Sequence, residues 1–67
     1  MNSFNSILKD LRIEKGLSQK QLAKELGVLE RTVSYWESGK RECDFDTLIL
    51  IAKFFAVSTD YLLGIED

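Results

Sequence analysis

The chain contains no histidine and no proline, and its 67 residues include a single cysteine and a single methionine. The lack of histidine removes the side chain most often used as a general base and as a metal ligand. A lone cysteine, Cys43, cannot form an internal disulfide, which is typical of a reducing compartment. No apolar run has the length of a membrane span or the form of a signal peptide, so we expect a cytoplasmic protein that makes no membrane contact.

The sequence also lacks the residue patterns that catalysis usually requires. The sequence has no glycine-rich loop of the kind that cradles phosphates, no cluster of metal-ligating residues, and no base pattern near its single thiol. We therefore predict that the protein is not an enzyme. We expect no metal, no cofactor and no small-molecule ligand.

What the sequence does contain is helical periodicity. No segment alternates apolar and polar residues with a period of two, which excludes a sheet. Hydrophobic residues make up 45% of the chain, enough for a compact core in one small domain spanning residues 1–67. We predict an all-α fold of five helices, at about residues 4–15, 18–26, 30–38 and 45–55, with a short fifth helix after Ser58.

The most informative segment is SQKQLAKELGVLERTVSYWESGK, residues 18–40. Ser18 and Gln21 have the spacing of a capping box, an apolar stripe follows them, and Gly27 supplies a left-handed helix stop. A second apolar stripe begins only a few residues later and ends at Gly39. Two short helices joined by about four residues that include glycine are typical of a helix-turn-helix, here over about residues 18–38.

Charge is distributed unevenly along the chain. The net charge is −2, whereas a domain that binds nucleic acid usually carries a basic footprint. Residues 15–41 hold six basic and three acidic side chains, while residues 42–67 hold six acidic side chains and one lysine. Positive charge is thus concentrated on the motif; the alternative is ordinary surface charge.

Four segments carry a resemblance to a known family: LKDLR (8–12), GLSQKQLAKELGV (16–28), WESGK (36–40) and LILIAKFFAVSTDYLLG (48–64). Together they resemble the Cro/repressor-type helix-turn-helix family, which includes the lambdoid phage repressors. The resemblance implies a five-helix domain that binds double-stranded operator DNA, commonly as a homodimer on an inverted repeat. It also implies a transcriptional regulator, most simply a repressor, that inserts its third helix in the major groove.

Site residues follow from the matching positions of that family. Arg31 is suited to bond a guanine edge bidentately, Glu30 to accept from cytosine, and Thr32 to touch a thymine methyl. The alternative for each is a merely solvated helix face. The resemblance assigns base or backbone contacts to Gln19, Glu30, Arg31, Thr32, Ser34, Tyr35, Lys40 and Arg41. It further implies that Arg12 and Glu37 form a partly buried, structural ion pair between the first and third helices.

Three positions depart from the family pattern towards aliphatic residues. Leu29 stands at the N-cap of the third helix, where Ser or Thr is usual. Ala56 stands where the fourth helix should end in Gly or Asn, because the left-handed region is unfavourable for a residue with a Cβ. Leu50 adds an apolar residue at a place that is usually polar.

These departures suggest a second hypothesis. The chain would then be a protein-interaction module or an antitoxin that uses an apolar fourth helix and binds DNA weakly or not at all. The two hypotheses differ in salt dependence, because DNA binding weakens steeply with salt. Candidate contacts for a dimer are Leu50, Phe54, Tyr61 and Leu62, with Leu63 and Ile65 equally plausible.

Overall fold

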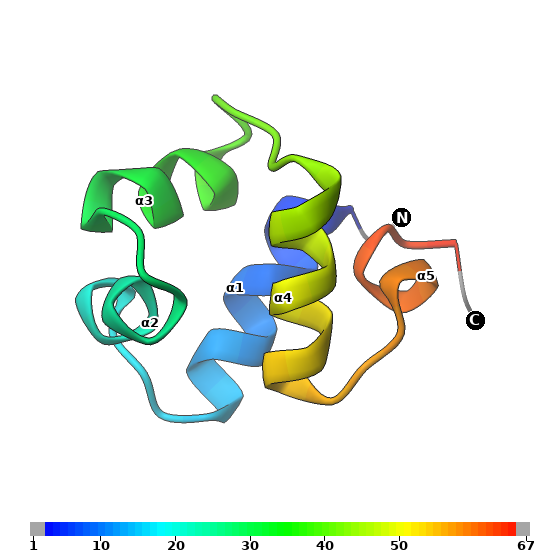
Figure 1. Cartoon of the computed structure of the whole chain (residues 1–67), viewed down its shortest axis with the longest axis horizontal. Helices are drawn as coiled ribbons and strands as arrows, with labels where there is room; N and C mark the ends of the chain where they lie inside the picture. Colours follow the sequence, from blue (N-terminus) through cyan, green and yellow to red (C-terminus); the bar gives the residue numbers. More distant parts are fainter. Residues whose placement is uncertain (1–2, 66–67) are drawn as a thin grey trace.

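A computed structural model describes residues 3–65 (Figure 1). Within that range every regular element is a helix, in agreement with the predicted all-α fold of five helices. The elements are α1 Phe4–Glu14, α2 Gln19–Leu26, α3 Glu30–Ser38, α4 Phe45–Phe55 and α5 Thr59–Leu62. Helices α2 and α3 pack against each other at one end of the molecule, and α5 lies at the opposite end against α1 and α4.

Local sequence signals explain where the helices begin. The Ser18 hydroxyl accepts a hydrogen bond from the Gln21 backbone N–H at 3.0 Å, and the Gln21 side chain accepts one from the Ser18 N–H at 2.8 Å. This is the predicted capping box. Asp44 and Ser58 cap α4 and α5 in the same way, each through its side-chain oxygen. Capping residues of this type satisfy backbone donors that have no partner within the helix.

The core draws one fully buried side chain from every helix. These are Leu8, Leu22, Val33, Ile51 and Leu62, in helix order, and each is 0% exposed. Burying a side chain of this size contributes about 1.5–3 kcal/mol. Because each helix supplies one anchor, the five helices are held as a single packed unit, and α3 has a fixed position on it.

Helix α4 ends in a strained conformation. Its C-cap, Ala56, has φ 57° and ψ 43°, and it is the only non-glycine residue with positive φ in the described part of the chain. The Val57 N–H closes the turn by donating to the Ala52 carbonyl at 2.9 Å. The predicted left-handed alanine is therefore confirmed, and the geometry costs on the order of 1 kcal/mol relative to glycine.

Candidate nucleic-acid interface

A tight turn sets the angle between α2 and α3. Gly27 adopts the left-handed conformation with φ 73°, and the Val28 N–H donates to the Ala23 carbonyl at 2.9 Å. The chain then enters α3 after a single extended residue, Leu29. The buried side chains of α2 and α3 fix the pair against α1, so the outward face of α3 is presented on a rigid support.

A partly buried polar network ties this pair of helices to α1. Arg12 Nε donates to Glu37 Oε2 at 2.7 Å and Nη2 donates to Oε1 at 3.1 Å, which is the predicted ion pair. The side chains are only 12% and 4% exposed. Arg12 Nη1 also donates to the Leu17 carbonyl at 2.8 Å. The bidentate geometry gives both charges a partner, which their burial requires.

Gln19 belongs to the same network, a role that was not anticipated from the sequence. Its Nε2 donates to Glu37 Oε1 at 3.1 Å, so the first residue of α2 is coupled to the penultimate residue of α3. The side chain is half-buried and turned towards Glu37. Gln19 thus has a structural partner, and any contact with a phosphate would use its remaining donor or the N-terminus of α2.

The outward face of α3 holds three of the eight predicted contact residues. Arg31, Ser34 and Tyr35 lie at positions i, i+3 and i+4, opposite the buried Val33 and Trp36. Arg31 and Tyr35 are exposed and Ser34 is half-buried between them.

Two further positions flank that face. Glu30 is exposed at the first turn of α3. Thr32 is half-buried and lies one turn before the core residue Trp36, at the edge of the face rather than within it.

The loop after α3 brings two more cations to this face. The backbone N–H groups of Lys40 and Arg41 donate to the Tyr35 carbonyl at 2.9 Å and 3.4 Å. Lys40 Nζ lies 5.8 Å from the centre of the Tyr35 ring, within range of a cation–π contact. These contacts hold the start of the loop beside the C-terminal turn of α3.

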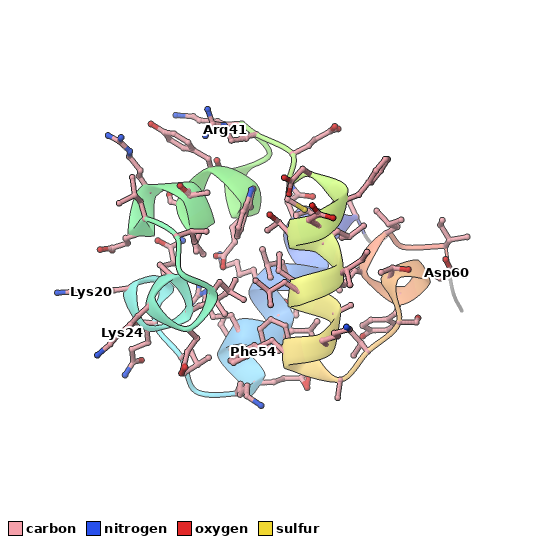
Figure 2. All side chains as sticks on the ribbon, viewed as in Figure 1. Lys20, Lys24, Arg41, Phe54 and Asp60 are labelled. Carbon is pink, nitrogen blue, oxygen red and sulfur yellow. The ribbon has the colours of Figure 1, made fainter. Side chains whose placement is uncertain are left out.

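Charge is separated along the long axis of the molecule. Figure 2 shows Lys20 and Lys24 projecting at the end formed by α2 and α3, whereas Asp60 lies at the opposite end on α5. Glu37 is neutralised by Arg12, so it does not reduce the positive charge of the motif surface. The chain can therefore be acidic overall while cations gather at the end formed by α2 and α3.

The sequence did not predict an open depression beside the turn. Ala23, Val28 and Leu29 form its apolar part, and its polar lining comes from Lys20, Gln21, Lys24 and Glu30. Leu29 is 59% exposed and makes no side-chain cap for α3, as its identity predicted. The pair of consecutive aliphatic residues after Gly27 was the available signal for this surface.

The predicted dimer contacts do not form one surface. Leu62 is fully buried in the core, so its assignment as a dimer contact is wrong. Phe54 is half-buried and packs edge-on against Phe55, with Lys15 Nζ 5.2 Å from its ring centre. Leu50 and Tyr61 are exposed. Phe54 therefore offers only part of its surface beside the exposed Leu50, which lies one turn earlier on α4.

A different apolar cluster lies around the start of α4. Phe45 is 84% exposed, and it lines one pocket together with Cys43 and Leu63. Ile65, also exposed, follows two residues after Leu63. Burial raises the pKa of the Cys43 thiol, which keeps it protonated and weakly reactive.

Residues 3–65 contain neither a cluster of metal-ligating side chains nor a membrane-spanning helix. No three His, Cys, Asp or Glu side chains come together as a set of metal ligands there. None of the five helices combines the length and the apolar character needed to cross a bilayer.

The α2–α3 geometry on a five-helix core defines a helix-turn-helix domain. Residues 8–62 match the helix-turn-helix family, and the chain belongs to it. The HTH-type transcriptional activator BcrR of Enterococcus faecalis is 45% identical over 64 residues, which is 96% of this chain and 31% of the relative. The HTH-type transcriptional regulator ImmR of Bacillus subtilis (strain 168) is 37% identical over 65 residues, 97% of this chain and 51% of the relative. The chain thus spans about a third to a half of these relatives.

A solved structure has the same fold. The P22 c2 repressor, solved in complex with a synthetic operator, superposes with a TM-score of 0.90 at 26% identity, covering 98% of this chain and 100% of that chain. Both the predicted fold and the resemblance to the Cro/repressor-type family are confirmed.

Proposed function

We propose that the chain binds double-stranded operator DNA through α3 and acts as a transcriptional repressor. The observation that carries the proposal is the outward face of α3, where Arg31 and Tyr35 are exposed on a helix fixed by the buried Arg12–Glu37 pair. A recognition helix needs this combination, because base contacts must be held in register by a rigid support. The relatives named as a transcriptional activator and a transcriptional regulator support a DNA-bound regulator, and the operator-bound P22 c2 repressor supports repression in particular.

The side chains divide into two roles. Arg31 bonds a guanine edge in the major groove, Glu30 accepts from cytosine N4, and Tyr35 contacts a neighbouring base or sugar. The other positions fix the domain on the backbone through phosphate contacts that carry no sequence information. Backbone positioning is assigned to Gln19, Ser34, Lys40 and Arg41, and Thr32 supports the edge of the base-contacting face.

Operator binding by a domain of this size calls for two copies. A homodimer would place two α3 helices about 34 Å apart on an inverted repeat. The exposed apolar side chains of Phe45, Leu63 and Ile65, with Leu50 and Tyr61 nearby in sequence, are the candidate contacts between copies. Such a regulator works in the cytoplasm, where Cys43 stays reduced. The proposal includes no enzymatic activity, cofactor or small-molecule ligand.

The test is selection of a random duplex library on the purified protein at near-physiological salt, followed by sequencing. We expect enrichment of an inverted repeat whose half-sites are one helical turn apart. Affinity for the selected site should then fall linearly on a log–log plot as salt rises. A folded protein that enriches no sequence would contradict the proposal.

A charge-matched pair of variants sharpens this test. Arg31→Ala and Lys53→Ala each remove one exposed cation, the first from α3 and the second from α4. Only Arg31→Ala should change the enriched sequence. Equal effects of the two variants would mean that general charge, and not the α3 face, governs binding.

A further inference from the structure

Leu29 is the N-cap of α3, and its side chain makes no capping hydrogen bond to the helix. The N-caps of α2, α4 and α5 are Ser18, Asp44 and Ser58, and each accepts a hydrogen bond through its side chain. Leu29 makes no such bond, so α3 begins without the stabilisation that a capping oxygen provides. The N-cap of α1, Ser3, also makes no side-chain cap bond, but Leu29 is the one N-cap of the five described helices whose side chain has no oxygen to offer, and it begins the helix that carries the proposed base contacts.

The side chain is also exposed where burial would be expected for leucine. The Leu29 residue is 59% exposed. Its backbone position is fixed, because the Leu29 carbonyl accepts a hydrogen bond from the Thr32 N–H at 2.9 Å in the first turn of α3. An exposed apolar group on a fixed backbone is a preformed contact point.

The surroundings of Leu29 indicate what it contacts. Together with Ala23 and Val28 it forms the apolar part of an open depression, which is also lined by Gln21 and by the charged side chains of Lys20, Lys24 and Glu30. A wholly apolar partner would leave these three charged side chains without polar partners. A DNA duplex matches both features, because phosphates pair with the lysines and the C5-methyl group of thymine is the apolar feature of the major groove.

We propose that Leu29 contacts the C5-methyl group of one thymine in each half-site and thereby determines specificity at that base pair. This inference rests on the proposed function. Because Leu29 directly precedes Glu30 and Arg31, the thymine lies beside the base pairs that those two residues contact. The chain would then have exchanged a helix cap for an apolar base contact.

The test replaces each thymine of the selected operator in turn by deoxyuridine, which removes only the methyl group. Binding is measured by fluorescence anisotropy at fixed salt for the wild type and for Leu29→Ser. One position per half-site should weaken wild-type binding about fourfold, from ~0.8 kcal/mol per buried methyl group and 1.4 kcal/mol per tenfold change. Leu29→Ser should bind the thymine and deoxyuridine duplexes equally at that position.

Two controls separate this effect from folding and from general apolarity. Leu29→Ser restores a capping hydroxyl, so its melting temperature should rise while its methyl discrimination disappears. Ile13→Ser removes an equally exposed aliphatic side chain from α1, where Ile13 is 56% exposed, and it should retain the discrimination.

The outcomes distinguish this inference from the proposed function. A protein that selects an operator but shows the same thymine-to-deoxyuridine ratio in wild type and Leu29→Ser would overturn the role of Leu29 alone. A folded protein that selects no operator would overturn both proposals.

Discussion

Replacing Glu37 by glutamine should destabilise the domain strongly, although the two side chains have nearly the same shape. Glu37 accepts two hydrogen bonds from Arg12, at 2.7 Å and 3.1 Å, and a third from Gln19 at 3.1 Å. The glutamine amide has one acceptor oxygen, and its NH₂ group faces a donor. At least one charge-assisted bond is lost, which costs about 1.5–3 kcal/mol, and the Arg12 guanidinium stays buried without a counter-charge.

The size of this effect matters because the domain is small. At about 0.05–0.15 kcal/mol per residue, its total stability is roughly 3–10 kcal/mol. Since 1 kcal/mol shifts the melting temperature of a 60–100-residue domain by about 4–8 °C, we expect Glu37→Gln to melt roughly 10–20 °C below the wild type. Circular dichroism at 222 nm during heating measures the change.

A double variant separates the buried charge from the packing. In Arg12→Met/Glu37→Met both charges are replaced by apolar groups, so no unpaired charge remains and much of the stability should return. An unchanged melting temperature in Glu37→Gln would refute the structural role of the pair. A double variant less stable than Glu37→Gln would show that loss of the bonds to the Leu17 carbonyl and from Gln19 costs more than the unpaired guanidinium.

Three further predictions concern single residues. Ala56→Gly should stabilise the fold by about 0.5–1 kcal/mol, because relief of the left-handed strain exceeds the extra entropy of the unfolded chain. Ala56→Val should destabilise the fold. Urea unfolding that gives the reverse order of stability would contradict the assigned strain. Hydrogen bonds from the side chain and backbone N–H of Thr47 hold the pKa of Asp44 below its ordinary value. The Asp44 cap therefore stabilises the fold fully above the pKa of the unfolded state, and this stabilisation is lost as the pH falls through the lower pKa of the folded state. The wild type and Asp44→Ala should thus converge in stability in acid. A difference in melting temperature that stays constant at all pH values would argue against the capping role. Arg41→Ala should weaken binding to all sequences alike and reduce the slope of log affinity against log salt by about one, as expected for a phosphate contact; a changed base preference in the selection assay would assign it to base contact instead.

The helices followed from the sequence because each has a local signal, whereas the Arg12–Glu37 pair joins residues 25 apart and was predicted from the family resemblance. The Ser18–Gln21 capping box, the left-handed Gly27 and the apolar stripes depend on residues a few positions apart, and the structure confirms all of them. The left-handed conformation of Ala56 was predictable for the same reason, because the prediction requires only that α4 end at that residue.

Surface properties were harder to predict because they depend on how helices distant in sequence pack. Periodicity marks Leu62 as apolar but does not say whether the core or a partner buries it, and the core does. The extreme exposure of Phe45 on α4 and the hydrogen bond from Gln19 on α2 to Glu37 on α3 depend on how these helices are placed relative to one another. Neither can be deduced from residues adjacent in the chain.

The most direct test of operator recognition by α3 is parallel selection of one random duplex library by the wild type and by Arg31→Ala. The wild type should enrich an inverted repeat with a guanine at one symmetric position of each half-site, and Arg31→Ala should enrich the same repeat with that single position degenerate. Identical base preferences in the two proteins would contradict the placement of Arg31, and with it α3, in the major groove.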